Sequence, residues 1–326
     1  MNGPELECHL DEHDLAAALR ADARAGLTAS PKQLPPKWFY DARGSELFEE
    51  ITRLPEYYPT RAERAVLAAR AAEIARITEA KTLIELGSGS SEKTRLLLDA
   101  LRGYGTLGAF VPFDVSEPAL RDAVAALAVE YPELDVHGAV GDFTEHLAQL
   151  PAGSARLIAF LGGTIGNLVP FQRKRFFAEL RAALETGEWF LLGADLVKDP
   201  AVLVPAYDDA AGVTAAFNRN VLHVLNRELG ADFAADRFDH VALWDPENEW
   251  IEMRLRATAA MRVHLAALDL TIEFAADEEL LTEVSAKFRR AGLERELAQA
   301  GFALRHWWTD PDGCFSLSLV EALAPT

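Results

Sequence analysis

Apolar and polar positions follow two alternating patterns between residues 61 and 195. Short apolar runs of strand length occur at 81–86, 109–114, 135–140, 156–161 and 189–195. Longer stretches with apolar residues at helical spacing separate them, at 61–78, 92–102, 117–129 and 170–185. Strands that alternate with helices predict a parallel sheet with helices packed on both faces. The predicted fold class is therefore α/β, with a doubly wound sheet.

The pattern changes after residue 195 and returns near the end of the chain. A helix is expected over 208–229, followed by four strands joined by short turns at 240–244, 250–256, 261–265 and 269–274. Short turns between strands favour antiparallel pairing. A helix over 286–300 and strands over 302–309 and 314–322 then complete the first sheet, and further helices are expected within 10–30 and over 45–52.

These patterns divide the chain into two expected domains. We interpret 198–286 as an insertion that joins the N-terminal segment in a second, smaller α+β domain. The expected boundaries are 62–197 plus 287–326 for the first domain and 9–61 plus 198–286 for the second. A length of 326 residues agrees with more than one compact domain.

The composition of the chain indicates which kinds of ligand and binding partner are expected. The net charge of −19 opposes a phosphate backbone, so nucleic acid is an unfavoured substrate. No apolar run approaches the length of a membrane span, and the polar start lacks the pattern of a secretory signal, so we expect a cytoplasmic protein that does not enter a membrane. Two cysteines and eight scattered histidines offer no disulfide framework and no metal-ligand spacing. We expect no metal, and a monomer that acts on a small molecule.

A glycine-rich turn follows the strand at 81–86. Gly87 and Gly89 allow a tight turn and a close approach to a ligand, and Ser90 and Ser91 are good caps for the next helix. A dinucleotide site would require a third glycine where this chain has Glu92. Because a carboxylate there would repel a pyrophosphate, the loop favours S-adenosylmethionine (SAM), which carries no phosphate.

Other polar residues follow the ends of the later strands. Asp114 ends the next apolar run, where a carboxylate often binds ribose hydroxyls, although NAD enzymes share this feature. Asp142 and Phe143 form a turn that is either an adenine contact or an ordinary turn. Asn167 closes the glycine-rich turn 161–167 as a ligand contact or a helix cap. Carboxyl ends of parallel strands meet at one edge, so Gly87, Asp114, Asp142 and 161–167 should converge.

Aromatic residues gather in the N-terminal segment. Residues 38–40 are Trp-Phe-Tyr, and a second aromatic pair stands at 57–58. Such rings can line a pocket or pack a lid against the core, and packing is the favoured interpretation on residue types alone.

Five segments carry a resemblance to a known family. They are residues 37–48 (KWFYDARGSELF), 51–63 (ITRLPEYYPTRAE), 85–94 (ELGSGSSEKT), 160–167 (FLGGTIGN) and 283–288 (EVSAKF). With these segments the chain resembles, over nearly its whole length, the histidine N-alpha-methyltransferases of ergothioneine biosynthesis. The first two segments and the last are much more specific than a glycine loop. The resemblance implies a Rossmann-like class I methyltransferase sheet with SAM as the methyl donor.

The resemblance also implies an activity and a set of contacts. The implied activity is trimethylation of the α-amine of L-histidine to histidine betaine (hercynine), the first step of ergothioneine biosynthesis. The implied SAM contacts are Gly87, Lys93, Asp114, Asp142 and Phe143. The implied contacts of the histidine carboxylate are Tyr57, Asn167 and Tyr207, and those of the imidazole are Glu283 and Ser285. Tyr40 would stand near the α-amine. Tyr207 and Glu283 rest on the resemblance alone.

Three alternatives remain open on the sequence. The same fold could act on another amino acid or amine, and the pair Glu283 and Ser285 is the feature that discriminates. A dinucleotide-dependent oxidoreductase is disfavoured by Glu92 and by the absent third glycine. A SAM-binding protein without catalysis is disfavoured because every position implied by the family is present. A further hypothesis is that Tyr40 or Phe48 accommodates the quaternary product by a cation–π interaction.

Overall fold

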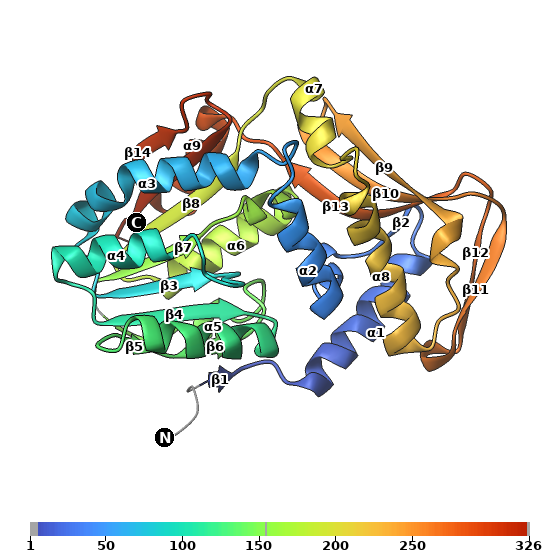
Figure 1. The fold of residues 1–326 in the computed structure, drawn as a ribbon, viewed down its shortest axis with the longest axis horizontal. Coiled ribbons are helices and arrows are strands. Elements are labelled where there is room, and N and C mark those ends of the chain that lie inside the picture. Colours follow the sequence, from blue (N-terminus) through green and yellow to red (C-terminus); the bar gives the residue numbers. More distant parts are fainter. Residues whose placement is uncertain (1–5, 154, 325–326) are drawn as a thin grey trace. The chain divides into compact units, whose positions relative to one another are not determined.

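The structure is a computed structural model that describes residues 6–153 and 155–324. The chain divides into two compact units, each built from segments that are separate in sequence. The first unit contains the described residues up to Leu10, Pro59–Val197 and the described residues from Lys287 onward. The second unit contains Asp11–Tyr58 and Lys198–Ala286. Each unit has its own sheet and its own core (Figure 1).

The first unit is built on one large sheet. Within the described residues its main path runs β1 (Leu6–Cys8), β6 (Gly138–Val140), β4 (Ala109–Asp114), β3 (Thr82–Leu86), β7 (Arg156–Phe160), β8 (Trp189–Asp195), β15 (Phe315–Ala322) and β14 (Phe302–Thr309), with β5 (Asp135–Val136) also paired to β4. All pairs are parallel except those that β15 makes with β8 and β14. This mostly parallel sheet confirms the predicted Rossmann-like fold class.

Helices cover both faces of this sheet. They are α3 (Pro59–Thr78), α4 (Arg95–Tyr104), α5 (Glu117–Glu130), α6 (Pro170–Ala183) and α9 (Arg290–Gln299). Successive strand residues point to opposite faces, so Leu191 of β8 joins the core cluster that includes Leu67 of α3 and Leu98 of α4. Its neighbour Phe190 contacts Phe176 of α6, with ring centroids 6.5 Å apart. Burial on both faces explains why these strands read as continuous apolar runs.

Two local expectations for the first unit were wrong, and one short strand was not predicted. Helix α4 begins at Arg95 and not at residue 92, and Ser90 and Ser91 stay in the loop because Thr94 occupies the N-cap position, without a side-chain cap bond. The run 135–140 forms two short strands, β5 and β6, separated by His137. Strand β1 was not predicted, since a three-residue edge strand has too short a pattern to detect.

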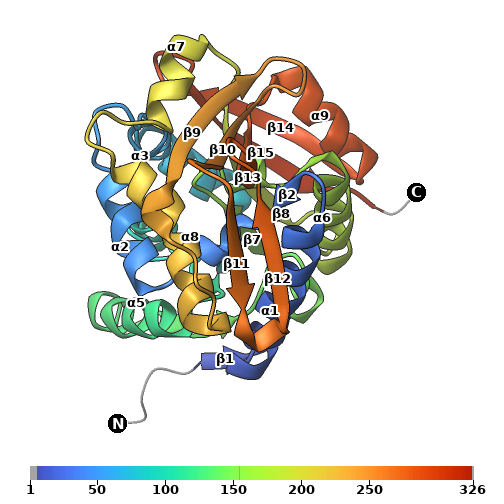
Figure 2. The same cartoon turned by 90° about the vertical axis from the view of Figure 1, so that its right-hand side faces the viewer.

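The second unit combines a small mixed sheet, a hairpin and several helices (Figure 2). The sheet order is β2 (Lys32–Gln33), β13 (Glu279–Ala286), β10 (Trp250–Ala257) and β9 (Phe238–Asp245), and the hairpin pairs β11 (Met261–Leu265) with β12 (Leu270–Phe274). The helices are α1 (Glu12–Thr28), α2 (Ala42–Ile51), the short α7 (Pro200–Leu203) and α8 (Val213–Leu229). One buried apolar cluster, with Phe39, Phe217 and Phe238 among its members, forms the core.

The region before α9 differs from its prediction. The expected helix over 286–300 begins only at Arg290, and Ala286 is the last residue of strand β13, which was not predicted. Residues Thr282–Ala286 are all buried, so β13 lacks the alternation of a half-exposed strand. Helix α8 likewise begins at Val213 and not at 208, after Gly212 with a φ of 74°. No helix within the described ranges is both long enough and apolar enough to cross a bilayer.

Candidate functional site

The glycine loop of the first unit is held against the end of the neighbouring strand. Gly87 and Gly89 have φ angles of 65° and 49°, in the left-handed region that favours glycine. The amides of Gly87 and Ser88 donate to the carbonyl of Phe113, at 2.8 and 3.1 Å. The amide of Gly89 donates to Oδ2 of Asp114 at 2.9 Å. The loop after β3 and the carboxylate at the end of β4 therefore form one structure.

Asp114 holds the glycine loop by hydrogen bonds and can still accept hydrogen bonds from a ligand. Its Oδ1 accepts from the amide of Ser116 at 3.0 Å, so each carboxylate oxygen receives one backbone N–H. Burial raises the pKa of Asp114, and the hydrogen bonds from these amides oppose the rise. A carboxylate oxygen has two lone pairs, so both oxygens can still accept hydrogen bonds from a pair of ligand hydroxyls.

The turn after β6 adds an acid and a fixed aromatic ring. Asp142 is buried, and its Oδ1 accepts from the amide and the hydroxyl of Thr144, at 2.8 and 2.6 Å. The ring of Phe143 contacts Phe160 with centroids 4.9 Å apart. Its edge lies 4.0 Å from the position that a Cβ on Gly87 would occupy. The predicted convergence of the turns after β3, β4 and β6 is therefore observed.

A buried carboxylate joins the turn after β7 to this group. Glu63 of α3 is fully buried, forms an ion pair with Lys93 and accepts from the amide of Gly162 at 2.8 Å through Oε1. The Nζ of Lys93 lies 3.6 Å from the Cβ position of Gly162. Asn167, half-buried, ends the 3₁₀ turn that follows this loop. Glu63 could not be identified from the sequence pattern, because an acid inside a helix gives no local sign of its distant partners.

Glu85 is a second buried acid that was not predicted from the sequence pattern. It lies within β3, and its carboxyl hydrogen-bonds the hydroxyl of Thr94. Burial raises its pKa to about 7. The hydroxyl of Ser88, in the loop beside it, is buried and has no hydrogen-bond partner among the described residues. A single carboxyl in an otherwise apolar strand was the signal that could have identified Glu85.

This set of residues fits SAM. The strand ends present the acids Asp114 and Asp142, and the charge of Lys93 is balanced by Glu63. Acids suit ribose hydroxyls and a cationic sulfonium and would repel a pyrophosphate. A Cβ on Gly89 would meet no atom within 4 Å, so the loop has open space on its outer side. No group of three or more acids, histidines or cysteines is arranged for a metal ion anywhere in the described ranges.

The second unit holds a chain of aromatic contacts. The centroid of Phe48 lies 5.6 Å from that of Tyr40 and 6.2 Å from that of Tyr57. Tyr57 in turn lies 6.3 Å from Tyr207, and Tyr40 lies 5.5 Å from Phe217. Tyr57 and Tyr207 are each 8% exposed, whereas Tyr40 is 37% exposed. Tyr40 is therefore the most accessible of the three tyrosines that take part in these ring contacts.

Strand β13 carries polar side chains next to these rings. The hydroxyls of Tyr207 and Ser285 share a hydrogen bond of 2.8 Å. Glu283 and Ser285 lie two residues apart and so point to the same face of the strand, and both are buried. The structure thus connects Tyr40, Tyr57, Tyr207 and Ser285 through contacts within the second unit, with Glu283 on the same strand face. Asn167 belongs to the first unit.

Comparisons with known proteins identify the family of this chain. The model of the family described as "Histidine-specific methyltransferase, SAM-dependent" matches residues 19–322. A histidine N-alpha-methyltransferase of Mycolicibacterium smegmatis is 59% identical over 315 residues, which cover 97% of this chain and 98% of that protein. Ergothioneine biosynthesis protein 1 of Neurospora crassa is 34% identical over 205 residues, or 61% of this chain and 23% of that protein. Among solved structures, the CcbJ methyltransferase of Streptomyces caelestis aligns with 17% identity and a TM-score of 0.49, over 87% of this chain and all of that one.

Proposed function

The chain belongs to the family of SAM-dependent histidine-specific methyltransferases, and from this premise we propose that it trimethylates the α-amine of L-histidine to hercynine. We further propose that this reaction is the first step of ergothioneine biosynthesis, as the name of the similar Neurospora crassa protein suggests. The observation that carries the proposal is the buried pair Glu283 and Ser285 on one face of β13, beside the hydroxyl of Tyr207, in a chain of this family.

In this proposal the first unit binds SAM. Asp114 accepts hydrogen bonds from the ribose hydroxyls, and Asp142 and Phe143 contact the adenine. Gly87 lets the backbone approach the cofactor, and Lys93, held by Glu63, contacts the methionyl end. SAM supplies an electrophilic methyl group on a sulfonium.

The second unit supplies histidine contacts in this proposal. Glu283 and Ser285 hydrogen-bond the imidazole, and Tyr57 and Tyr207 bind the carboxylate. Tyr40 lies near the α-amine in this proposal. An apolar side chain in place of imidazole would leave the buried Glu283 and Ser285 without partners, which costs about 1–3 kcal/mol per group, or ten- to a hundredfold in preference.

Fixing both ends of histidine places its amine for the reaction. In each transfer the nitrogen would first lose a proton to water or to a nearby acceptor. It would then form a bond to the methyl carbon while the carbon–sulfur bond breaks and S-adenosylhomocysteine leaves with the electron pair. An α-amine is largely protonated near neutral pH, so the site must favour its neutral form. The rings of Tyr40 and Phe48 would contact the quaternary product through cation–π attraction.

Mass spectrometry of reactions with SAM tests the proposal. L-histidine should gain one, two and then three methyl groups, whereas histamine and other amino acids stay unmodified. Glu283→Ala should raise the KM for histidine at least about tenfold. Glu279→Ala is a matched control, because Glu279 lies on the same strand but pairs with Arg256 on the opposite face. Methylation of a different amine, with histidine unmodified, would refute the substrate assignment.

A further inference from the structure

A buried histidine of the second unit is bonded through both ring nitrogens. The side chain of His240 on β9 is 3% exposed. Its Nε2 lies 2.8 Å from the backbone oxygen of Tyr207, and its Nδ1 lies 2.9 Å from the amide nitrogen of Asn218. A backbone oxygen can only accept and an amide NH₂ can only donate, so His240 carries its proton on Nε2 and is neutral. Burial lowers the pKa of His240, in agreement with this state.

Asn218 of α8 extends this contact to two neighbouring strands. It is fully buried, and its NH₂ group donates to His240 and to the carbonyl of Arg254 at 3.1 Å. Its Oδ1 accepts from the hydroxyl of Thr282 at 2.7 Å. Both donors and the acceptor are used, and rotation of the amide by 180° would set its oxygen against the Arg254 carbonyl. The orientation of Asn218 is therefore determined.

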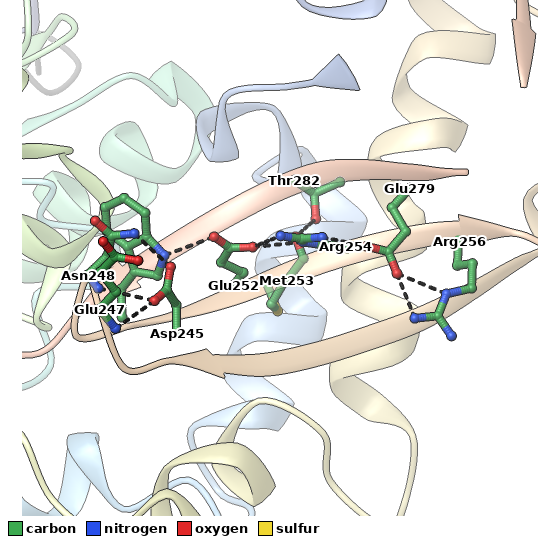
Figure 3. Close-up of polar contacts among 10 residues, drawn as sticks. Asp245, Glu247, Asn248, Glu252, Met253, Arg254, Arg256, Glu279 and Thr282 are labelled. Atoms are coloured by element: carbon green, nitrogen blue, oxygen red, sulfur yellow. Dashed lines mark hydrogen bonds and ion pairs between the residues drawn. The ribbon is translucent and has the colours of Figure 1, made fainter. Parts of the chain in front are cut away.

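Thr282 is the extra residue of a β-bulge. Met253 pairs with Glu283, but the next residue of β10, Arg254, pairs with Leu281, so Thr282 has no partner in the register. Its hydroxyl also lies 2.9 Å from the carbonyl of Met253, toward which it points in Figure 3. A bulge of this kind changes the face to which the following residues point.

The bulge decides where the proposed imidazole contacts point. With it, Glu283 and Ser285 stand opposite Met253 and Ile251, which belong to the buried core. Continuous pairing without the extra residue would place Glu283 opposite Glu252, on the outer face. That face carries a ladder of charges in which Arg254 bonds Glu252 and Glu279, and Arg256 bonds Glu279 (Figure 3). Two carboxylates directly opposite each other would repel.

We propose that His240, Asn218 and Thr282 form a positioning network for the imidazole end of the substrate site, an inference that rests on the proposed function. At one end the network holds the bulge that directs Glu283 and Ser285 inward. At the other end it holds the backbone of Tyr207, whose hydroxyl returns to Ser285 and closes a ring of contacts. The three residues act through others and do not touch the substrate.

The charged groups near His240 do not change the conclusion that its ring is neutral. Oδ1 of Asp208 lies 3.9 Å from Nε2, and Asp209 and Arg219 also act on the ring at longer range. Burial has the largest effect and lowers the pKa of His240, whereas the hydrogen bond to the Tyr207 carbonyl and the two acids raise it and Arg219 lowers it. Protonation would direct a second N–H at the NH₂ group of Asn218, which cannot rotate without losing its other bonds.

Thr282→Val and Thr282→Ser form the central pair of variants. Valine keeps the shape of threonine and removes the hydroxyl, whereas serine keeps the hydroxyl. We expect Thr282→Val to raise the KM for histidine about tenfold, with kcat and the Kd for SAM near those of the wild type. Thr282→Ser should restore most of the affinity for histidine. Asn218→Leu should have an effect that is not additive with that of Thr282→Val, because both remove the same contact.

Asn226→Leu is the matched control. Asn226 lies on the same helix and bridges the amide and carbonyl of Phe233, at 2.9 and 2.8 Å, with no bond to the network. It should lower the melting temperature and leave the KM for histidine unchanged. Suppose that the wild type methylates histidine, but that Thr282→Val and Asn218→Leu, like Asn226→Leu, lower the melting temperature and leave the KM for histidine unchanged. The network then has only a structural role and the inference is refuted. A wild type inactive on histidine would refute the proposed function itself, and the inference with it.

Discussion

Replacement of Glu85 by glutamine should change how the free energy of unfolding depends on pH. Glu85 is 3% exposed, and its pKa rises from 4.5 to about 7 in the folded chain because burial disfavours the charged form. Between these two values the folded chain keeps a proton that the unfolded chain has lost. Stability from this group is therefore complete below pH 4.5 and decreases as the pH rises toward 7.

The size of this effect follows from the two pKa values. From pH 5 to pH 8, ionisation of Glu85 should cost the wild type about 2 to 3 kcal/mol of stability. Glutamine has nearly the shape of the protonated acid and does not titrate. The difference in unfolding free energy, variant minus wild type, should therefore increase by that amount over the same range, whatever its value at pH 5.

Equilibrium unfolding in guanidinium at pH 5, 6, 7 and 8 measures this difference. Other titrating groups are shared by both proteins and cancel in the subtraction. Glu92→Gln is the control, because Glu92 lies in the following loop with 67% of its side chain exposed and should give a nearly constant difference. Parallel stability curves for Glu85→Gln and the wild type would refute the assignment of a raised pKa to the buried carboxyl.

Two further predictions concern buried ion pairs of the first unit. Glu188→Ala should destabilise the chain by about 3–5 kcal/mol, because Arg156, with 5% of its side chain exposed, would lose its carboxylate partner and the amides of Arg156 and Glu185 would lose their acceptor. Thermal unfolding measures the loss, and an unchanged melting temperature would contradict it. Glu63→Gln should weaken SAM binding about tenfold, because Lys93 would lose the negative charge with which it pairs. Calorimetric titration with SAM measures the Kd. An unchanged Kd would contradict a role for this ion pair in cofactor binding.

Features of this protein that depend on local sequence could be predicted. The strands that form the centre of the first sheet are buried on both faces, so they appear as separate apolar runs, and the ends of such strands share one edge. This is why the sequence alone predicts that Gly87, Asp114, Asp142 and the turn 161–167 converge, and contacts between these turns are observed. The family assignment is likewise confirmed, because it depends on specific motifs and not on packing.

Features that depend on residues distant in the sequence could not be predicted. Strand β13 is buried along Thr282–Ala286 and contains an acid, so its residues show neither a strand period nor a core composition. The residues around Glu63 and Glu85 in the sequence do not reveal their roles. The properties of a carboxyl group change only when folding buries it and brings charged or hydrogen-bonding partners to it.

The sequence by itself determined the fold class, the family and the chemical character of the cofactor loop, because hydrophobic period, glycine positions and motif identity are local properties of a chain. Only the tertiary structure decided which face of β13 carries Glu283 and Ser285. That choice depends on one unpaired residue, Thr282, and on Asn218 and His240, which come from other elements. Strand register has a period of two, so a single extra residue reverses the direction of every side chain beyond it, and only the pairing with β10 reveals it.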